Sequence, residues 1–266
     1  MTMNSLDEKR TFKFAFDLAS RLNETGIQHY HVGNFQRSHQ SFSSALECVT
    51  ILTFKIMHHS DGESDPLHAT TSICSLKQHR FSDLVFQEGL NFEVNGEIIM
   101  PFSTLNIQYE AIEDTATALN LTSMVILHNL ALLYFGARNM QKTRSLLHIL
   151  LELSEDFEEM QDLYNIHEMK EQIIGSSQLL LGFSMLLKDE HSDIEAVMHL
   201  LECVRIHQNL PGSNHLLMYG LFMTIGQVLL GAGFHEDALP CFERAQRHLL
   251  ESQIQPELKD SAAAAA

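Results

Sequence analysis

Apolar residues recur along most of this chain at spacings of three and four, a pattern that predicts amphipathic helices. Two distant stretches also share one detailed order: two glycines seven residues apart, an aromatic residue nine positions later and an alanine three positions after that. These residues are Gly26, Gly33, Phe42 and Ala45 in the first stretch, and Gly226, Gly233, Phe242 and Ala245 in the second. An ordinary helical bundle explains the apolar spacings but not the glycine spacing. We therefore interpret the stretches as copies of a structural repeat, which must stack on its neighbours to bury its apolar face.

The repeat resembles the tetratricopeptide repeat, a unit of about 34 residues built from two antiparallel helices. In such a unit the first helix carries a bulky residue and, four positions later, a small residue that lets a neighbouring helix approach closely. The second helix carries an apolar residue and a small one three positions later, on the same face. The first-helix slots hold Leu22 and Gly26, Leu127 and Ala131, and Phe222 and Gly226. The second-helix slots hold Phe42 and Ala45, Leu200 and Cys203, and Phe242 and Ala245, with Leu147 and Leu150 as an imperfect pair.

The resemblance implies an all-α fold, a right-handed solenoid of helical hairpins, as a single domain over residues 1–261. The clearest repeats run over about 19–52, 124–157 and 219–252, and a degenerate repeat runs over about 175–209. Residues 262–266 form a low-complexity alanine tail.

The helical pattern fails between the first two repeats, over about 59–112. Residues 59–66 are polar and rich in turn formers, which predicts an exposed loop. Asn95-Gly96 separates two apolar runs, which predicts a short β-hairpin or extended arm over about 84–101, because both central residues of such a turn need positive φ. Insertions in repeat arrays often contact partners, but a hairpin that only covers the core is the alternative.

Charge narrows the classes of partner. The chain has 17 basic and 34 acidic residues, a net charge of −17, so it lacks the basic footprint that nucleic acid or an anionic membrane requires. Acidic residues are densest between Glu152 and Glu171, where a solubilising surface and a docking stripe both remain open. With 45% hydrophobic residues, the chain can bury a core.

One apolar stretch raises the question of a membrane span. Residues 208–234 contain no Asp, Glu, Lys or Arg and exceed the roughly 20 residues that a span needs. Polar residues interrupt the stretch, and Pro211 to Asn214 predict a loop and helix cap, with the following helix ending near Gly231 to Gly233. We therefore expect a buried helix of the solenoid rather than a span.

Cysteine usage and the start of the chain bear on the compartment. The four cysteines, Cys48, Cys74, Cys203 and Cys241, are widely spaced with no Cys-x-x-Cys pair. The chain starts without a charged and then apolar leader. We expect reduced thiols in a cytoplasmic protein, with the nucleus left open.

Motifs for catalysis or metal binding are weak. Among 16 histidines, His199 and His207 flank Cys203 at helical spacing, but the three residues drift around the helix, Cys203 occupies a packing slot and no fourth ligand is evident. The chain contains no Gly-rich phosphate loop, Gly-x-Ser-x-Gly elbow or His-Glu-x-x-His helix. We expect no metal, cofactor or catalytic residues.

The resemblance implies an adaptor with a concave groove, lined by first helices, that holds a peptide or helix of another protein. Carried over residue by residue, the groove positions are Asn23, Ile27, Tyr30, His31, His128, Asn129, Leu132, Met223 and Gln227. One subset of the family grips a partner's C-terminal carboxylate. Asn129 matches the asparagine of that subset, but Asn23 and Ile27 stand where the subset has Lys and Asn, so capture of an acidic tail is disfavoured.

We therefore expect a non-catalytic protein–protein interaction adaptor or scaffold whose partner is a protein or peptide of basic or amphipathic character. Nucleic acid and membranes are not expected partners. A self-associating structural protein, forming a homodimer through its apolar groove, is the alternative, and an enzyme is disfavoured.

Overall fold

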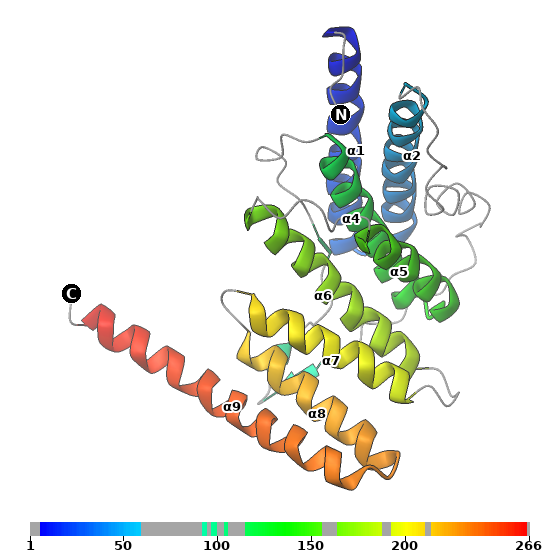
Figure 1. Cartoon of the computed structure of the whole chain (residues 1–266). Coiled ribbons are helices and arrows are strands. Elements are labelled where there is room, and N and C mark those ends of the chain that lie inside the picture. The colour runs from blue at the N-terminus through cyan, green and yellow to red at the C-terminus, as the bar shows by residue number, and fades with distance from the viewer. Residues whose placement is uncertain are drawn as a thin grey trace. The chain divides into compact units, whose positions relative to one another are not determined.

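The computed structural model describes residues 6–59, 92–94, 97–99, 104–105, 115–155, 164–187, 193–210 and 214–264. Helices make up nearly all of the described chain, which confirms the all-α class (Figure 1). The helices are α1 (Leu6–His31), α2 (Phe35–His59), α4 (Thr115–Gly136), α5 (Met140–Glu155), α6 (Tyr164–Leu186), α7 (Asp193–Asn209), α8 (His215–Gly231) and α9 (His235–Ala264). Helix α9 therefore continues beyond residue 252, where the last repeat was expected to end.

The chain divides into two compact units. Unit 1 comprises residues 1–88 and 104–173, and unit 2 comprises residues 89–103 and 174–266, so the boundary falls within α6. In unit 1, α1 packs against α2, α2 against α4, and α4 against α5. In unit 2, α7 packs against α8 and α8 against α9.

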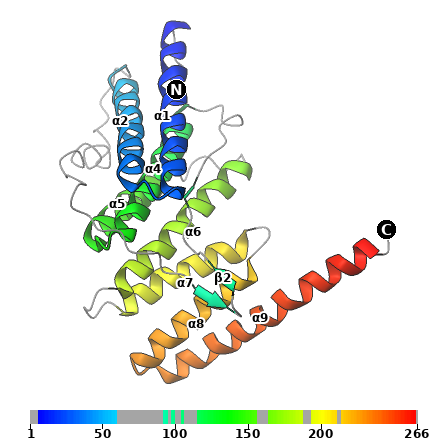
Figure 2. The same cartoon turned by 180° about the vertical axis from the view of Figure 1, so that it is seen from behind.

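Two short strands belong to unit 2 (Figure 2). Strand β1 (Phe92–Val94) pairs antiparallel with β2 (Glu97–Ile99), with Phe92 opposite Ile99. The expected turn residues 95 and 96, the loop expected at 60–66 and Cys74 lie outside the described residues.

Three first helices end with the same hydrogen-bonded turn. In each, a residue with positive φ donates its N–H to the carbonyl three residues back, and the next residue donates to the carbonyl five residues back. This is the Schellman arrangement, which satisfies carbonyls at the end of a helix. The positive-φ residues are Gly33, Arg138 and Gly233, with φ of 75°, 58° and 89°. Glycine occupies this position in the outer copies, and arginine adopts the same conformation in the middle one.

The glycines of the first-helix slots lie against the aromatic residues of the second helices, as the sequence predicts. A Cβ added at Gly26 would lie 2.5 Å from the ring of Phe42, and one at Gly226 would lie 2.7 Å from the ring of Phe242. In the degenerate repeat, a Cβ on Gly182 would lie 2.9 Å from Leu200. No side chain larger than hydrogen fits these slots unless the facing residue moves.

The core of unit 1 is centred on α4, which is buried without a break from residue 121 to 135. Among the described residues, α4 is also the helix that is long and apolar enough to cross a membrane, over Thr117–Gly136. In the fold, 94% of that apolar window is buried, as expected of a core helix. The apolar stretch considered in the sequence instead forms α8, which ends at Gly231 as predicted. Met218, Leu221 and Ile225 lie on its buried face.

Candidate functional site

Two buried asparagines meet between α1 and α4 in unit 1. Asn23 on α1 and Asn129 on α4 are both fully buried, and the Nδ2 of Asn129 donates a hydrogen bond of 2.9 Å to the Oδ1 of Asn23. A buried carboxamide is costly unless its donors and acceptor are satisfied. The bond between the two side chains meets part of this requirement and fixes the orientation of the Asn129 amide.

The chain's own backbone meets the rest of the requirement. The N–H of Leu105 donates to the Oδ1 of Asn129 at 2.8 Å, and the Nδ2 of Asn129 donates to the carbonyl oxygen of Leu105 at 2.9 Å. The Nδ2 of Asn23 reaches the same carbonyl at 3.5 Å. Asn129 thus binds both polar groups of one residue, as a neighbouring antiparallel strand does at a hydrogen-bonded pair. We call Asn23 and Asn129 the asparagine clamp.

A third contact holds the residue before Leu105. The hydroxyl of Thr104 lies 3.4 Å from the Nε2 of His31, which is near the end of α1. Both Thr104 and Leu105 are half-buried. A two-residue stretch outside the helices and strands is therefore held by polar side chains from two different helices.

Several groove positions taken from the resemblance converge here. Asn23, His31 and Asn129 contact the segment 104–105. Tyr30 is half-buried and packs edge to face on Phe35, with ring centroids 5.7 Å apart. Burial raises the pKa of its hydroxyl above the usual value.

The other groove positions lie elsewhere. His128 and Leu132 are 2% exposed, so they lie within the core of unit 1, and Ile27 is half-buried on α1. Met223 and Gln227 lie on α8, which belongs to unit 2.

Thr104 and Leu105 are the residues that sequence reasoning missed. They fall within the 59–112 insertion and carry no motif. Their role depends on backbone groups, which every residue possesses, so no side-chain pattern marks it. The one available signal was the pair of asparagines themselves, because a buried amide requires partners.

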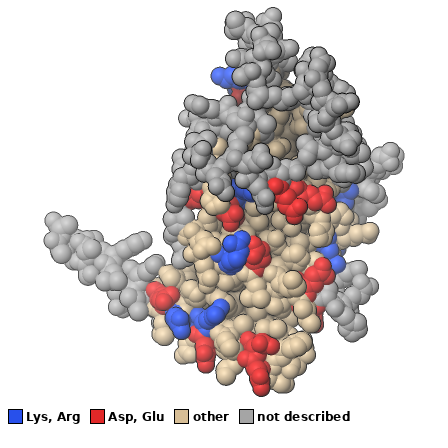
Figure 3. Space-filling model, in the orientation of Figure 1, with Lys and Arg blue, Asp and Glu red and all other residues tan. Residues whose placement is uncertain are grey.

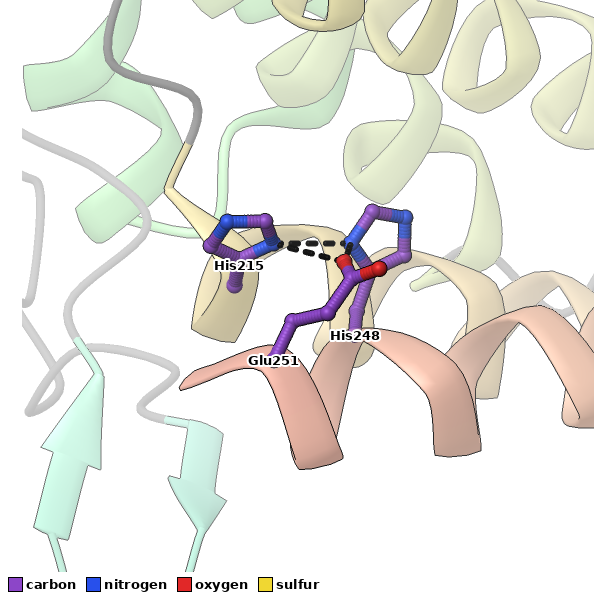
Figure 4. Close-up of side chains that lie close together, drawn as sticks. All are labelled: His215, His248 and Glu251. Carbon is purple, nitrogen blue, oxygen red and sulfur yellow. Dashed lines mark hydrogen bonds and ion pairs between the residues drawn. The ribbon is translucent and has the colours of Figure 1, made fainter. Parts of the chain in front are cut away.

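A second cluster of polar side chains lies in unit 2, where α8 and α9 lie side by side (Figure 4). His215 is the first residue of α8, while His248 and Glu251 lie one turn apart on α9. The two histidine Nδ1 atoms are 3.1 Å apart. The Oε2 of Glu251 lies 3.2 Å from the Nδ1 of His215 and 3.5 Å from the Nδ1 of His248. The imidazole side chains are 18% and 16% exposed and the carboxylate side chain 44%.

Contacts on both helices hold the histidines of this cluster in place. The side-chain oxygen of Asn214 accepts hydrogen bonds from the N–H groups of Leu216 and Leu217, which caps α8 directly before His215. The ring of His248 stacks on that of Phe222, with centroids 5.7 Å apart and an interplanar angle of 11°. Burial lowers the pKa of His248, opposed by the charge of Glu251 and reinforced by those of His215 and Arg247.

Of the three residues that the sequence singled out for metal binding, His199 contacts a glutamine and Cys203 is packed in the core. The Nδ1 of His199 lies 2.6 Å from the Oε1 of Gln178. Cys203 is fully buried, which confirms its packing role, and burial together with Glu202 raises the pKa of its thiol to about 12. His207 has a buried Nε2 without a hydrogen-bond partner, and burial lowers its pKa.

Comparison with known proteins identifies no relative of this chain. No protein-family model matches the chain, and no curated protein matches its sequence. The likeness to tetratricopeptide repeats therefore depends on the slots and turns described above. The asparagine clamp is neutral and accepts or donates hydrogen bonds only, so its chemistry is that of binding rather than of proton transfer.

Proposed function

We propose that this protein is a non-catalytic interaction adaptor of tetratricopeptide type that binds an extended segment of a partner protein at the asparagine clamp of unit 1. The observation that carries the proposal is the double hydrogen bond between Asn129 and the backbone of Leu105. A carboxamide that holds both the N–H and the C=O of one residue recognises extended chain of almost any sequence. The helical hairpins, with their shared Schellman turns and close-approach glycines, support the solenoid on which such clamps are displayed.

The clamp is organised before any partner arrives. The Oδ1 of Asn23 already accepts a hydrogen bond from the Nδ2 of Asn129. The Asn129 side chain therefore loses little conformational freedom when it binds a backbone. Because both side chains are buried, leaving them without a backbone partner would cost about 1 to 3 kcal/mol. This cost favours a clamp that is occupied, and within the chain Thr104 and Leu105 occupy it.

A partner segment would take the place of Thr104 and Leu105. The internal segment benefits from being tethered, so a partner must offer further contacts to compete with it. The net charge of −17 favours a basic or amphipathic partner and raises its rate of association. On the face shown in Figure 3, the described basic side chains lie singly or in small groups among acidic ones.

The test uses the chain's own sequence as a probe. A fluorescent peptide of residues 102–107 is titrated into the full chain and into Leu105→Pro, a variant whose residue 105 lacks the N–H that Asn129 accepts. We expect fluorescence anisotropy to show tighter binding to Leu105→Pro, because the internal segment competes less well there. Glu24→Gln, a change of equal size at an exposed position beside Asn23, is the matched control and should bind as the wild type does.

A second probe peptide decides the outcome. A probe peptide with N-methylleucine in place of leucine lacks the same N–H and should bind Leu105→Pro at least about tenfold more weakly, the value of one well-formed hydrogen bond. Both peptides are titrated into the same variant, so loss of fold cannot explain a difference between them. Equal binding of the two peptides would show that the clamp does not read the backbone in trans.

A self-associating structural protein is the second candidate function, and one surface favours it. Ile194, Met198 and Leu201 form an apolar stripe at helical spacing on α7 and are 57%, 65% and 42% exposed. A pair of chains could bury this stripe. Light scattering would give a dimeric mass at micromolar concentration that Met198→Glu converts to a monomeric mass, whereas a monomeric wild type would eliminate this candidate.

A further inference from the structure

The three atoms that converge in unit 2 are spaced like the ligands of a small metal ion. The separations between the His215 Nδ1, the His248 Nδ1 and the Glu251 Oε2 are 3.1, 3.2 and 3.5 Å. Four ligands placed tetrahedrally at about 2.0 Å from a zinc ion lie about 3.3 Å from one another. The cluster therefore has the dimensions of one face of a zinc coordination tetrahedron, with no rearrangement of the helices needed.

We propose that His215, His248 and Glu251 bind a first-row divalent metal ion of the zinc class. Among the described residues, His215, His248 and Glu251 are the group of three potential metal ligands whose ligand atoms all lie within 4.8 Å of one another. Two imidazoles and one carboxylate are a ligand set that zinc accepts in proteins, and such a set leaves the fourth position open to water or an external ligand. The site is independent of the asparagine clamp and of the proposed adaptor function.

A proton or a metal ion can hold these three atoms together. A neutral imidazole carries one N–H, so at each Nδ1 there is either a proton or a lone pair. When one Nδ1 is protonated and the other is not, the N–H donates to the second imidazole, 3.1 Å away, or to the Glu251 carboxylate. A metal ion takes the place of that proton because all three atoms then donate lone pairs to the same centre.

The surroundings hold one imidazole in place and supply negative charge. The stacking of His248 on Phe222 fixes the plane of the His248 ring. Glu251 supplies negative charge, and the chain as a whole carries −17. The positive charge of Arg247 would repel a metal ion, but this side chain is exposed, so water and salt screen its charge.

Binding would join the start of α8 to the middle of α9. The two ligands on α9 are three residues apart and therefore lie on one face of the helix, while His215 reaches them from the neighbouring helix. A bound ion would add a cross-link at the end of this helical hairpin that is opposite to the Gly233 turn. Unit 2 should consequently unfold at a higher temperature in the presence of the ion.

The test is a zinc titration of the purified full chain after treatment with a chelator. We expect calorimetry to show one ion per chain, and cobalt in place of zinc to give the intense visible absorption of a tetrahedral site. His215→Ala and Glu251→Gln should each weaken binding by more than about 100-fold, since loss of a residue that only orients a ligand already costs 10- to 100-fold. His199→Ala is the matched control, because His199 contacts Gln178 outside the cluster, and it should bind as the wild type does.

Two results would overturn the proposal. One is the absence of zinc binding by a chain whose circular dichroism and melting curve are those of a folded protein. The other is undiminished binding by the double variant His215→Ala, His248→Ala, which would assign the ion to other residues. Because Glu251→Gln changes neither size nor packing, its effect separates loss of a ligand from loss of the fold.

Discussion

The imidazole of His39 on α2 contacts the hydroxyl of Tyr134 on α4, with Nε2 and the hydroxyl oxygen 3.1 Å apart and the rings edge to face. This contact joins the first helical hairpin of unit 1 to the second. Burial, and then the charge of Lys142, lowers the pKa of His39 from 6.5 to about 4. The folded protein therefore keeps His39 neutral over a pH range in which the unfolded chain protonates it.

This shift predicts that stability falls on acidification between pH 6.5 and about 4. In that window the unfolded state binds the proton that the folded state refuses, so the free energy of unfolding decreases as the pH falls. The loss should be about 1 to 2 kcal/mol after allowance for the partial exposure of the ring. Denaturant unfolding at pH 7 and pH 4.5 should show a smaller loss in His39→Gln than in the wild type. The exposed His235→Gln is the control and should behave as the wild type does.

The slot at Gly226 yields a prediction about packing. Leucine at this position must displace the ring of Phe242, so Gly226→Leu should lower the free energy of unfolding by about 1 to 3 kcal/mol. Gly231→Leu, in the same helix, is the control, because a Cβ there meets nothing within 4 Å. Thermal melting measures both variants. Equal midpoints for the two would remove the close-approach role from Gly226.

The turn at Arg138 predicts a stabilising change. An L-amino acid with a side chain loses about 1 kcal/mol or more in the left-handed region, whereas glycine enters it freely. Arg138 is exposed at φ 58°, so Arg138→Gly should raise the stability by up to about 1 kcal/mol. Arg138→Val should lower it, because a branched side chain is the least tolerated there. If urea unfolding showed Arg138→Val to be more stable than Arg138→Gly, the result would contradict the turn conformation.

The comparison of Arg138 with Gly33 and Gly233 shows what the sequence could reveal about the fold. Spacing identified the close-approach slots in two copies because glycine marks both the slot and the turn. In the middle copy Ala131 still marks the slot, but arginine at the turn conceals the repeated backbone conformation. The structure finds this conformation because the hydrogen bonds of the Schellman turn do not depend on the side chain.

The two sites were less accessible to sequence reasoning. His215 and His248 lie in different helices, and they become neighbours only when the pairing of α8 with α9 is known. The two histidines lie at comparable distances on either side of Gly233, whereas helical spacing alone relates His199 to Cys203. The asparagines of the clamp were found by resemblance, but Leu105 could not be, because tertiary hydrogen bonds alone define its position.

The hydrogen bond between the Leu105 amide and Asn129 leads to the final prediction, which concerns exchange with solvent. An amide that is bound to a buried side chain exchanges only when that contact opens. In Asn129→Ala the Leu105 amide should exchange about tenfold or more faster, which corresponds to loss of one hydrogen bond. Asn23→Ala should have a smaller effect, because Asn23 contacts only the Leu105 carbonyl, at 3.5 Å, and holds Asn129 in place. Hydrogen-exchange mass spectrometry of fragments spanning residues 102–108 measures this, with fragments from α9 as an internal reference.

If exchange at Leu105 rises while α9 stays protected, the clamp has opened without unfolding of the chain. If both rise together, Asn129 is a core residue whose loss unfolds the protein, and the clamp would lose its separate role.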